Sequence, residues 1–332
     1  MTFSFIIPVY NRPEEIDELL ESLTKQNSRE IFDVLIIEDG STIPCEYVIA
    51  KYKSKLNITY YLKYNSGPGD SRNFGMSQSK NDYFIILDSD CIIPDNYLTE
   101  VSNSLKEKYV DCFGGPDAML PNFSKTQKAI NFTMTSIITT GGVRGGSEKM
   151  QKFQPRSFNM GISQKAFEAS KGFSNIHPGE DPDLSIRLWK LNFETKLISK
   201  AFVYHKRRID WEKFYTQMNK FGKARPILNN WHPEYKSFTF FFPSIFVIGF
   251  FVGVILILFT WDWILKFYFI YTVLIFLVSS IQNKNIYIGY LSIIAIWKQF
   301  FGYGLGFMTS FFKINILKQN PQQAFPELFF KV

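Results

Sequence analysis

Phe3-Ser4-Phe5-Ile6-Ile7-Pro8-Val9 is an apolar run near the start of the chain, and Asn11 and Pro13 after it are turn and helix-start signals. The run is too short for a signal-peptide core and lacks a basic leader, so it predicts a buried strand. Apolar residues then recur at helical spacing between residues 16 and 23, and residues 32–37 form another β-rich run. This opening segment is therefore a strand–helix–strand unit.

The same alternation continues through the next fifty residues. Residues 58–62 predict a strand, residues 66–79 a glycine-containing loop and helix, and residues 83–87 a buried strand that ends at Asp88-Ser89-Asp90. Alternating strands and helices predict an α/β fold whose mainly parallel sheet binds ligands beyond the carboxyl ends of its strands. Residues 121–152 carry no pattern that assigns them.

Composition excludes several classes of protein. The 332 residues can bury a large core without disulfides, and the cysteines Cys45, Cys91 and Cys112 have neither disulfide nor zinc spacing. The net charge is +7, but basic residues crowd between residues 206 and 236, just before a hydrophobic tail. Such clusters mark the cytosolic flank of membrane spans, so we expect membrane lipids, and no nucleic acid, as the partner of this charge.

The hydrophobic tail predicts a helical hairpin in the membrane. Residues 238–261 carry no charged side chain and are long enough to cross a hydrocarbon core of about 30 Å. Residues 263–281 form a second candidate span after a short turn at Asp262. Residues 286–312 contain Lys298, Gln299 and several glycines, so three readings stay open for them: spanning, re-entering or lying against the membrane.

A basic helix is expected before the tail. Apolar residues follow helical spacing from Trp211 to Phe221, whereas Lys213, Lys220 and Lys223 occupy other positions. One interpretation is an interfacial helix lying in the lipid headgroups. The other is a helix packed on the globular core.

Asp88-Ser89-Asp90 is a DxD motif at the end of a predicted strand. Carboxylate oxygens suit Mg²⁺ or Mn²⁺, which keep some waters and bridge to phosphate oxygens. Acidic pairs also solvate strand ends, so the motif alone is weak support for a metal site.

Two further segments carry polar residues at strand ends and helix starts. In Glu38-Asp39-Gly40-Ser41 an acidic side chain is placed to accept a nucleobase N–H, although a plain strand-to-loop turn has the same pattern. Small residues before Arg72 permit close backbone approach, and the planar donor fork of Arg72 suits a phosphate. This loop is neither a Walker P-loop nor the dinucleotide fingerprint.

Gly179-Glu180-Asp181 predicts an acidic loop that opens a helix, with Leu184 and Leu188 facing the core. Acidic residues at a helix N-terminus are common capping and dipole partners, so one of them is expected to be structural. The functional interpretation gives Asp181 a proton to remove.

Taken in order, these segments resemble the family 2 glycosyltransferases, which have the GT-A fold, a Rossmann-like nucleotide-diphospho-sugar transferase domain. The matching segments are Phe5-Ile6-Ile7-Pro8-Val9-Tyr10-Asn11, Glu38-Asp39-Gly40-Ser41, Gly69 to Asn73, Asp88-Ser89-Asp90, Gly172-Phe173, and Gly179-Glu180-Asp181 with Leu184 and Arg187. Ordered agreement is more specific than any single motif. The hydrophobic tail is consistent with the membrane-bound members.

The resemblance implies a role for individual residues. Asp181 would be the catalytic general base, with Glu180 and Arg187 as acceptor-binding or supporting residues. The implied donor-binding residues are Pro8, Tyr10, Asn11, Asp39 at the nucleobase, Arg72 at the phosphates or sugar, Asp88 and Ser89. Asp90, Asp88 and His205 would hold Mg²⁺ or Mn²⁺, although a structural role for His205 is equally open. Glu38 replaces a commoner aspartate, which leaves the nucleobase contact less defined.

The implied activity is inverting transfer of a sugar from a nucleotide-sugar donor, a UDP-sugar by family default, to a glycan or lipid-linked acceptor in polysaccharide biosynthesis. An inactive membrane-anchored nucleotide-sugar-binding protein is the alternative; a transporter has too few spans and intramembrane polar groups. Expected boundaries are a GT-A domain at residues 1–209, a linker helix at 210–236, two or three membrane helices at 237–315 and a tail at 316–332. We expect a multi-pass inner-membrane protein whose catalytic domain is cytosolic.

Overall fold

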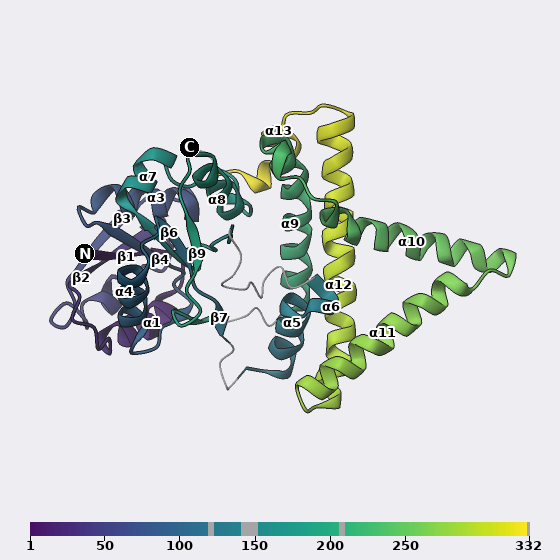
Figure 1. Cartoon of the computed structure of the whole chain (residues 1–332), viewed down its shortest axis with the longest axis horizontal. Coiled ribbons are helices and arrows are strands. Elements are labelled where there is room, and N and C mark those ends of the chain that lie inside the picture. The colour runs from purple at the N-terminus through teal and green to yellow at the C-terminus, as the bar shows by residue number, and fades with distance from the viewer. Residues whose placement is uncertain (119–122, 141–151, 206–209, 331–332) are drawn as a thin grey trace. The chain divides into compact units, whose positions relative to one another are not determined.

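The computed structural model describes residues 1–118, 123–140, 152–205 and 210–330, and the chain forms two compact units (Figure 1). Unit 1 comprises Met1–Leu120, Gly146–Lys206 and Phe329–Val332, and unit 2 comprises Pro121–Gly145 and Arg207–Leu328. Helices within residues 123–140 thus group with the C-terminal helices in unit 2, and Phe329 and Phe330 group with unit 1.

Unit 1 is built on a seven-stranded sheet in the order β3-β2-β1-β4-β8-β6-β9. Its strands are β1 (Phe3–Val9), β2 (Phe32–Asp39), β3 (Ile58–Lys63), β4 (Tyr83–Leu87), β6 (Cys112–Gly114), β8 (Asn159–Ser163) and β9 (Thr195–Leu197). The first four strands are parallel, whereas β8 runs antiparallel to both β4 and β6. The predicted α/β class and parallel core are confirmed, with one antiparallel strand inserted.

A second, three-stranded sheet has the order β5-β10-β7, with β5 at Cys91–Ile92, β7 at Asp117–Ala118 and β10 at Val203–His205. Strand β10 runs antiparallel to β5, so the backbone of His205 lies opposite Cys91. This pairing brings the late histidine of the sequence next to the DxD motif in register.

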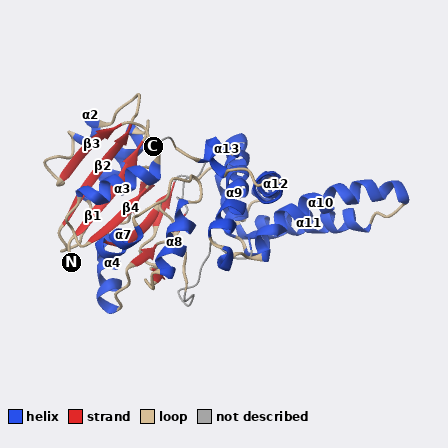
Figure 2. Ribbon diagram, turned by 90° about the horizontal axis from the view of Figure 1, so that it is seen from above, coloured by secondary structure: helices blue, strands red, loops and turns tan. Residues whose placement is uncertain are grey.

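Helices cover both faces of the large sheet, because alternate residues of each strand point to opposite sides (Figure 2). The helices of unit 1 are α1 (Pro13–Thr24), α2 (Glu46–Ile49), α3 (Pro68–Gln78), α4 (Tyr97–Glu107), α7 (Gln164–Ser170) and α8 (Glu180–Lys190). Phe5 and Ile7 of β1 pack with α1 and α4 on one face, whereas Ile6 packs with α3, α7 and α8 on the other. Leu184 and Leu188 are fully buried, as their spacing predicted.

Unit 2 is helical and centres on the long helix α12. Its helices are α5 (Lys125–Thr135), α6 (Ile137–Thr140), α9 (Trp211–Trp231), α10 (Phe242–Leu256), α11 (Trp263–Gln282), α12 (Ile286–Ser310) and α13 (Pro321–Ala324). Helices α9 and α12 lie side by side (Figure 1). A Cβ on Gly222 would come within 2.1 Å of Tyr303 O, so only glycine permits this approach.

The apolar face of α9 is buried against other helices. Phe214 and Met218 pack with Ala295 of α12 and with Ile130 and Met134 of α5. Within unit 2 these two side chains are therefore covered by α12 and α5, and small residues on α12 such as Gly302 admit the close approach.

Three segments are long and apolar enough to cross a membrane by length and composition: Phe238–Phe259, Trp263–Gln282 and Ile286–Ile316. They match the three candidate segments expected from the sequence. Their burial differs: 17% of the most apolar window is buried in each of the first two and 50% in the third.

Candidate active site

The polar residues singled out in the sequence meet at one edge of the large sheet. Strands β2, β1 and β4 are parallel neighbours, so Asp39 at the end of β2, Asn11 after β1 and Asp88 after β4 lie at the same edge. In an open α/β sheet this edge is where ligands bind. Pro8, within β1, pairs with Ile37, and Tyr10 beyond the strand is 51% exposed.

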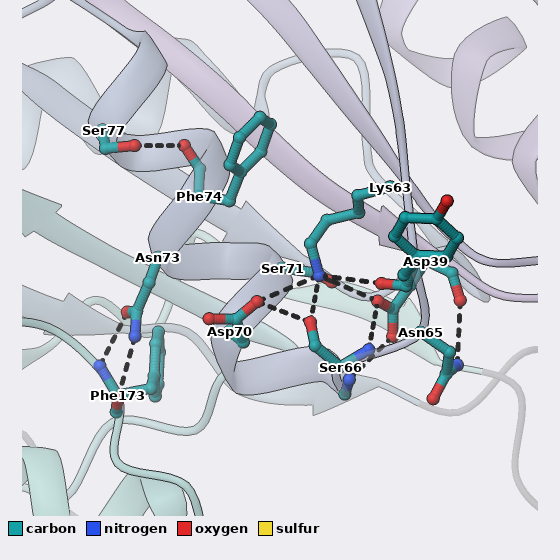
Figure 3. Close-up of polar contacts among 12 residues, drawn as sticks. Asp39, Lys63, Asn65, Ser66, Asp70, Ser71, Asn73, Phe74, Ser77 and Phe173 are labelled. Atoms are coloured by element: carbon teal, nitrogen blue, oxygen red, sulfur yellow. Dashed lines mark hydrogen bonds and ion pairs between the residues drawn. The ribbon is translucent and has the colours of Figure 1, made fainter. Parts of the chain in front are cut away.

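The carboxylate of Asp39 is held by the loop that follows β3 (Figure 3). Asp39 Oδ1 accepts from Ser66 N at 2.9 Å and Oδ2 accepts from Gly67 N at 3.0 Å, while the side chain is almost fully buried. Gly67 has φ 92°, a conformation that favours glycine. Asp39 thus shapes this loop, whatever it binds.

Lys63, which was not among the site residues predicted from the sequence, lies beside Asp39. Its Nζ is 3.1 Å from Asp39 Oδ1 and 2.9 Å from Asp70 Oδ2, and it also donates to Ser66 Oγ (Figure 3). The ammonium therefore offsets two acidic side chains around the same loop. Its position as the last residue of a strand next to an acidic turn was the available signal.

Glu38 and Asn11 hold backbone rather than an open pocket. Glu38 is completely buried and accepts from Cys45 N at 2.8 Å and from the Tyr60 hydroxyl at 3.2 Å. Asn11 Oδ1 accepts from the backbone N–H groups of Thr42 and Ile43 at 2.8 and 3.0 Å. Both residues fix the turn between β2 and α2, which positions neighbouring Asp39.

Arg72 of α3 is the centre of a buried ionic network. Its Nη2 donates to Asp88 Oδ1 at 2.8 Å, its Nη1 donates to Glu180 Oε1 at 3.2 Å, and its guanidinium lies 5.3 Å from the centroid of the Phe173 ring. The side chain is 3% exposed. Burial lowers the pKa of Arg72, but the two carboxylates outweigh this effect and raise it overall.

Glu180 and Asp181 are neighbouring acids at the start of α8, and the contacts of Glu180 give it a structural role. It is 3% exposed, and Oε1 also lies 2.8 Å from His177 Nδ1. Burial opposes its charge, yet His177 and Arg72 hold the pKa of Glu180 down, at about 2. Burial likewise disfavours a charged His177, but Glu180 raises the pKa of the imidazole. His177 was missed because nothing in its local sequence marks it.

Asp181 has the opposite electrostatic environment. Burial, followed by the neighbouring charge of Glu180, raises the pKa of Asp181 to about 6, although Arg72, Arg156 and a hydrogen bond with Ser157 favour its charged form. Its Oδ1 is buried without a hydrogen-bond partner among the described residues. A carboxylate with a raised pKa and a free acceptor atom suits a general base.

Arg187 holds the back of this helix. It pairs with Asp183 at 2.8 Å and donates to the carbonyl oxygens of Ser170 and Gly172. These contacts tie α8 to the turn that carries Phe173. Arg187 is thus engaged in supporting the loop.

The DxD motif contacts two arginines. Asp88 pairs with Arg72, and the Arg12 guanidinium donates to Asp90 Oδ2; Ser89 between them is buried. Among described residues no three His, Cys, Asp or Glu side chains form a ready cluster for a metal ion. The two carboxylates that follow β4 are oxygen donors of the kind that hard cations take, and the backbone of His205 lies opposite Cys91. The His205 side chain lies outside the described part of the structure.

This fold, with acidic and basic residues at the carboxyl ends of its parallel strands, is of the GT-A type. The model of glycosyl transferase family 2 matches residues 4–168, and the chain is a member of this family. Poly(ribitol-phosphate) beta-N-acetylglucosaminyltransferase TarS of Staphylococcus aureus is 36% identical over 114 residues, which are 33% of this chain. The match spans only 20% of TarS.

Solved structures agree with the fold. The crystal structure of S. aureus TarS 1-349 has a TM-score of 0.50 at 23% identity, covering 67% of this chain and 64% of that one. Mannosyltransferase PcManGT from Pyrobaculum calidifontis, in complex with GDP-Man and Mn²⁺, has a TM-score of 0.53 at 13% identity, covering 68% and 64%. At these identities both likenesses concern the fold alone.

Proposed function

We propose that this chain is an inverting, metal-dependent glycosyltransferase that moves a sugar from a UDP-sugar to a hydroxyl of a glycan or lipid-linked acceptor at the cytosolic face of the inner membrane. The observation that carries the proposal is the buried pair Glu180 and Asp181, whose pKa values are driven apart beside Arg72. The TarS name supports a donor carrying N-acetylglucosamine and a poly(ribitol-phosphate) acceptor.

In this mechanism Asp181 removes the proton of the acceptor hydroxyl as its oxygen attacks the anomeric carbon. The new carbon–oxygen bond forms on the face opposite the bond to the nucleoside diphosphate, which breaks, so the configuration inverts. Asp39 and its loop receive the nucleobase, and Arg72 offsets negative charge near the diphosphate. Asp90 and Asp88, with His205, would hold Mg²⁺ or Mn²⁺, which when bound supplies Lewis-acid stabilisation of the leaving group.

The test is a donor screen on detergent-solubilised protein. UDP-GlcNAc, UDP-glucose and GDP-mannose are each offered with Mn²⁺, Mg²⁺ or EDTA, together with poly(ribitol phosphate) or a bacterial lipid extract, and nucleoside diphosphate release is measured. We expect acceptor-dependent release from a UDP-sugar that EDTA abolishes. Donor binding without release across the panel would instead favour the catalytically inactive nucleotide-sugar-binding protein.

A further inference from the structure

The chain returns to unit 1 after all three apolar segments have passed. Phe330 N donates to Asn175 Oδ1 at 3.1 Å, and Asn175 Nδ2 donates to Phe330 O at 2.7 Å, so one side-chain amide binds both backbone groups of Phe330. The Phe330 ring lies against Gly67, where a Cβ would meet it at 2.2 Å, and 6.2 Å from the His177 ring. Residues 329 and 330 are therefore built into unit 1.

This docking restricts how often the chain crosses a bilayer. Residues 1–118, 152–205 and 329–330 all belong to unit 1, and in the membrane placement proposed above this unit lies on one side of the bilayer. A chain that leaves one side and returns to it crosses an even number of times. Three consecutive crossings by the segments that begin at Phe238, Trp263 and Ile286 are therefore excluded.

The packing of unit 2 identifies the segment that does not cross. Helix α9 accompanies α12: Asn219 Nδ2 donates to Gly302 O at 3.1 Å, and Asn315 Nδ2 donates to Asn230 Oδ1 at 3.0 Å. Helix α9 is too polar for a hydrocarbon core, with charged residues Glu212, Lys213, Lys220, Lys223 and Arg225. A helix that is flanked along its length by such a neighbour lies where water and headgroups are accessible.

The hairpin of α10 and α11 is inclined to α12 rather than parallel to it. Ser244, near the start of α10, donates to Gly304 O at 3.3 Å, and Ser279, near the end of α11, bonds to Ser292 at 2.7 Å. Both contacts lie at the open end of the hairpin, yet they are twelve residues apart on α12, about 18 Å along a helix. Helix α12 is seen end-on in Figure 2, where α10 and α11 extend sideways from it.

We propose that only the α10–α11 hairpin spans the bilayer, whereas α12 lies at the membrane surface, on the side of the transferase unit, with α9 along it. The proposal rests on the membrane placement proposed above. Spans of 22 and 20 residues are about 33 and 30 Å long, which matches the hydrocarbon thickness. The far side of the hairpin is the turn at Asp262, and the chain after α12 stays on the near side, where Phe330 reaches Gly67.

The test is single-cysteine labelling in intact cells with a membrane-impermeant maleimide, followed by labelling after permeabilisation. The three native cysteines are buried, so they leave little background. The variants are Lys236→Cys before the hairpin, Asp262→Cys at its turn and Gln319→Cys after α12, all at exposed positions. We expect Asp262→Cys to react in intact cells and the other two only after permeabilisation.

Each alternative gives its own pattern. Reaction of Gln319→Cys together with Asp262→Cys would show that α12 spans, and would overturn the proposal. Equal accessibility of all three would show that nothing spans, which also removes the proposed membrane placement. The mirror pattern, with only Asp262→Cys protected, keeps the even crossing number but contradicts a cytosolic catalytic unit.

A second measurement tests the docking on which the crossing argument depends. In native membranes, the double variant Asn175→Cys/Phe330→Cys should be joined by a short bifunctional thiol reagent, and neither single variant should be. After protease cleavage between the two positions, joined protein would run on a denaturing gel as one band, and protein that is not joined would run as two fragments. Failure of the pair to join in labelled, folded protein would contradict the docking and with it the even crossing number.

Discussion

Arg72 Nη1 lies 3.2 Å from Glu180 Oε1, which joins residues 108 positions apart in the sequence. Both side chains are at most 5% exposed, so this ion pair lies in a region shielded from water, beside the pairs of Arg72 with Asp88 and of Glu180 with His177. This ion pair fixes the start of α8 relative to α3. It therefore positions Asp181, the next residue, at the strand ends.

Arg72→Ala is expected to be strongly destabilising. Removing one partner of a buried ion pair leaves an uncompensated charge, at a cost of about 3–5 kcal/mol. The thermal unfolding midpoint in detergent should fall accordingly, and nucleoside diphosphate binding should weaken. Arg29→Ala, an exposed arginine elsewhere in unit 1, is the matched control and should change stability by less than about 0.5 kcal/mol. Similar midpoints for the two variants would contradict a buried network.

Asp181→Asn should retain donor binding and lose turnover by about 10²–10⁴-fold, the usual contribution of a general base. Because the pKa of Asp181 is about 6, the wild-type rate should fall as the pH decreases through that value, when the carboxylate becomes protonated. A pH profile of kcat measures this limb. In Asp183→Asn, which alters the partner of Arg187 instead, the limb should remain. If Asp181→Asn turned over at a normal rate and its kcat still fell over the same pH range, the general base would be another residue.

The raised pKa of Asp181 also predicts how the stability of the fold depends on pH. Activity should rise with pH, whereas the contribution of Asp181 to stability should fall. Between about pH 4 and pH 6 the folded protein binds a proton at Asp181 that the unfolded chain has already released, so this residue lowers stability as the pH rises through that window. Above pH 6 the penalty is complete, on the order of 2–3 kcal/mol. Asp181→Asn should therefore unfold at a higher temperature than wild type at pH 7.5 and lose that advantage near pH 4.

The strand-end rule explains which parts of the site were predictable. Asp39 and Asp88 each follow a buried apolar run, and parallel strands place such ends together, so local pattern sufficed for them. Helix α5 was also signalled, because Ser124 and Gln127 form a capping box, but the isolated motif was not recognised. Neither the donor sugar nor the acceptor could be identified from the sequence, because both depend on pocket shape and on variable loops such as residues 139–147, of which residues 141–147 lie outside the described part of the structure.

Partners brought together by tertiary packing left no such signal. Arg12 meets Asp90 across 78 positions, and Phe330 meets Asn175 across 155, so neither pairing is visible in spacing or periodicity. Periodicity marked the apolar face of α9 but not what covers it. The partner of α9 is decided by glycines of α12 that allow the two helices to approach closely. In the sequence these glycines indicated only a weakened helix.

Asp90→Ala should abolish the response of donor binding to Mn²⁺, because a neutral methyl cannot replace a charged ligand of a hard cation. Arg12→Ala should have the opposite effect and tighten Mn²⁺ binding, since the guanidinium now occupies Asp90 Oδ2. Calorimetric titration of Mn²⁺ into solubilised protein, with UDP present or absent, measures both. Arg29→Ala again serves as the control. Unaltered Mn²⁺ binding in Asp90→Ala would exclude this residue as a ligand.

Phe330→Ala should weaken nucleotide binding although the residue lies some 260 positions from the loop it touches. Its ring covers Gly67, whose N–H binds Asp39, so removing the ring frees the loop that presents the nucleobase carboxylate. We expect a several-fold rise in the dissociation constant of UDP, with amide hydrogen exchange accelerated at residues 66 and 67.

Phe330→Leu, which keeps apolar contact, should restore most of the affinity, and Asn175→Ala should reproduce the loss because it releases the same segment. The double variant Asn175→Ala/Phe330→Ala should be no worse than either single one, since both changes undo one docking event. Additive losses would mean that the two residues act independently.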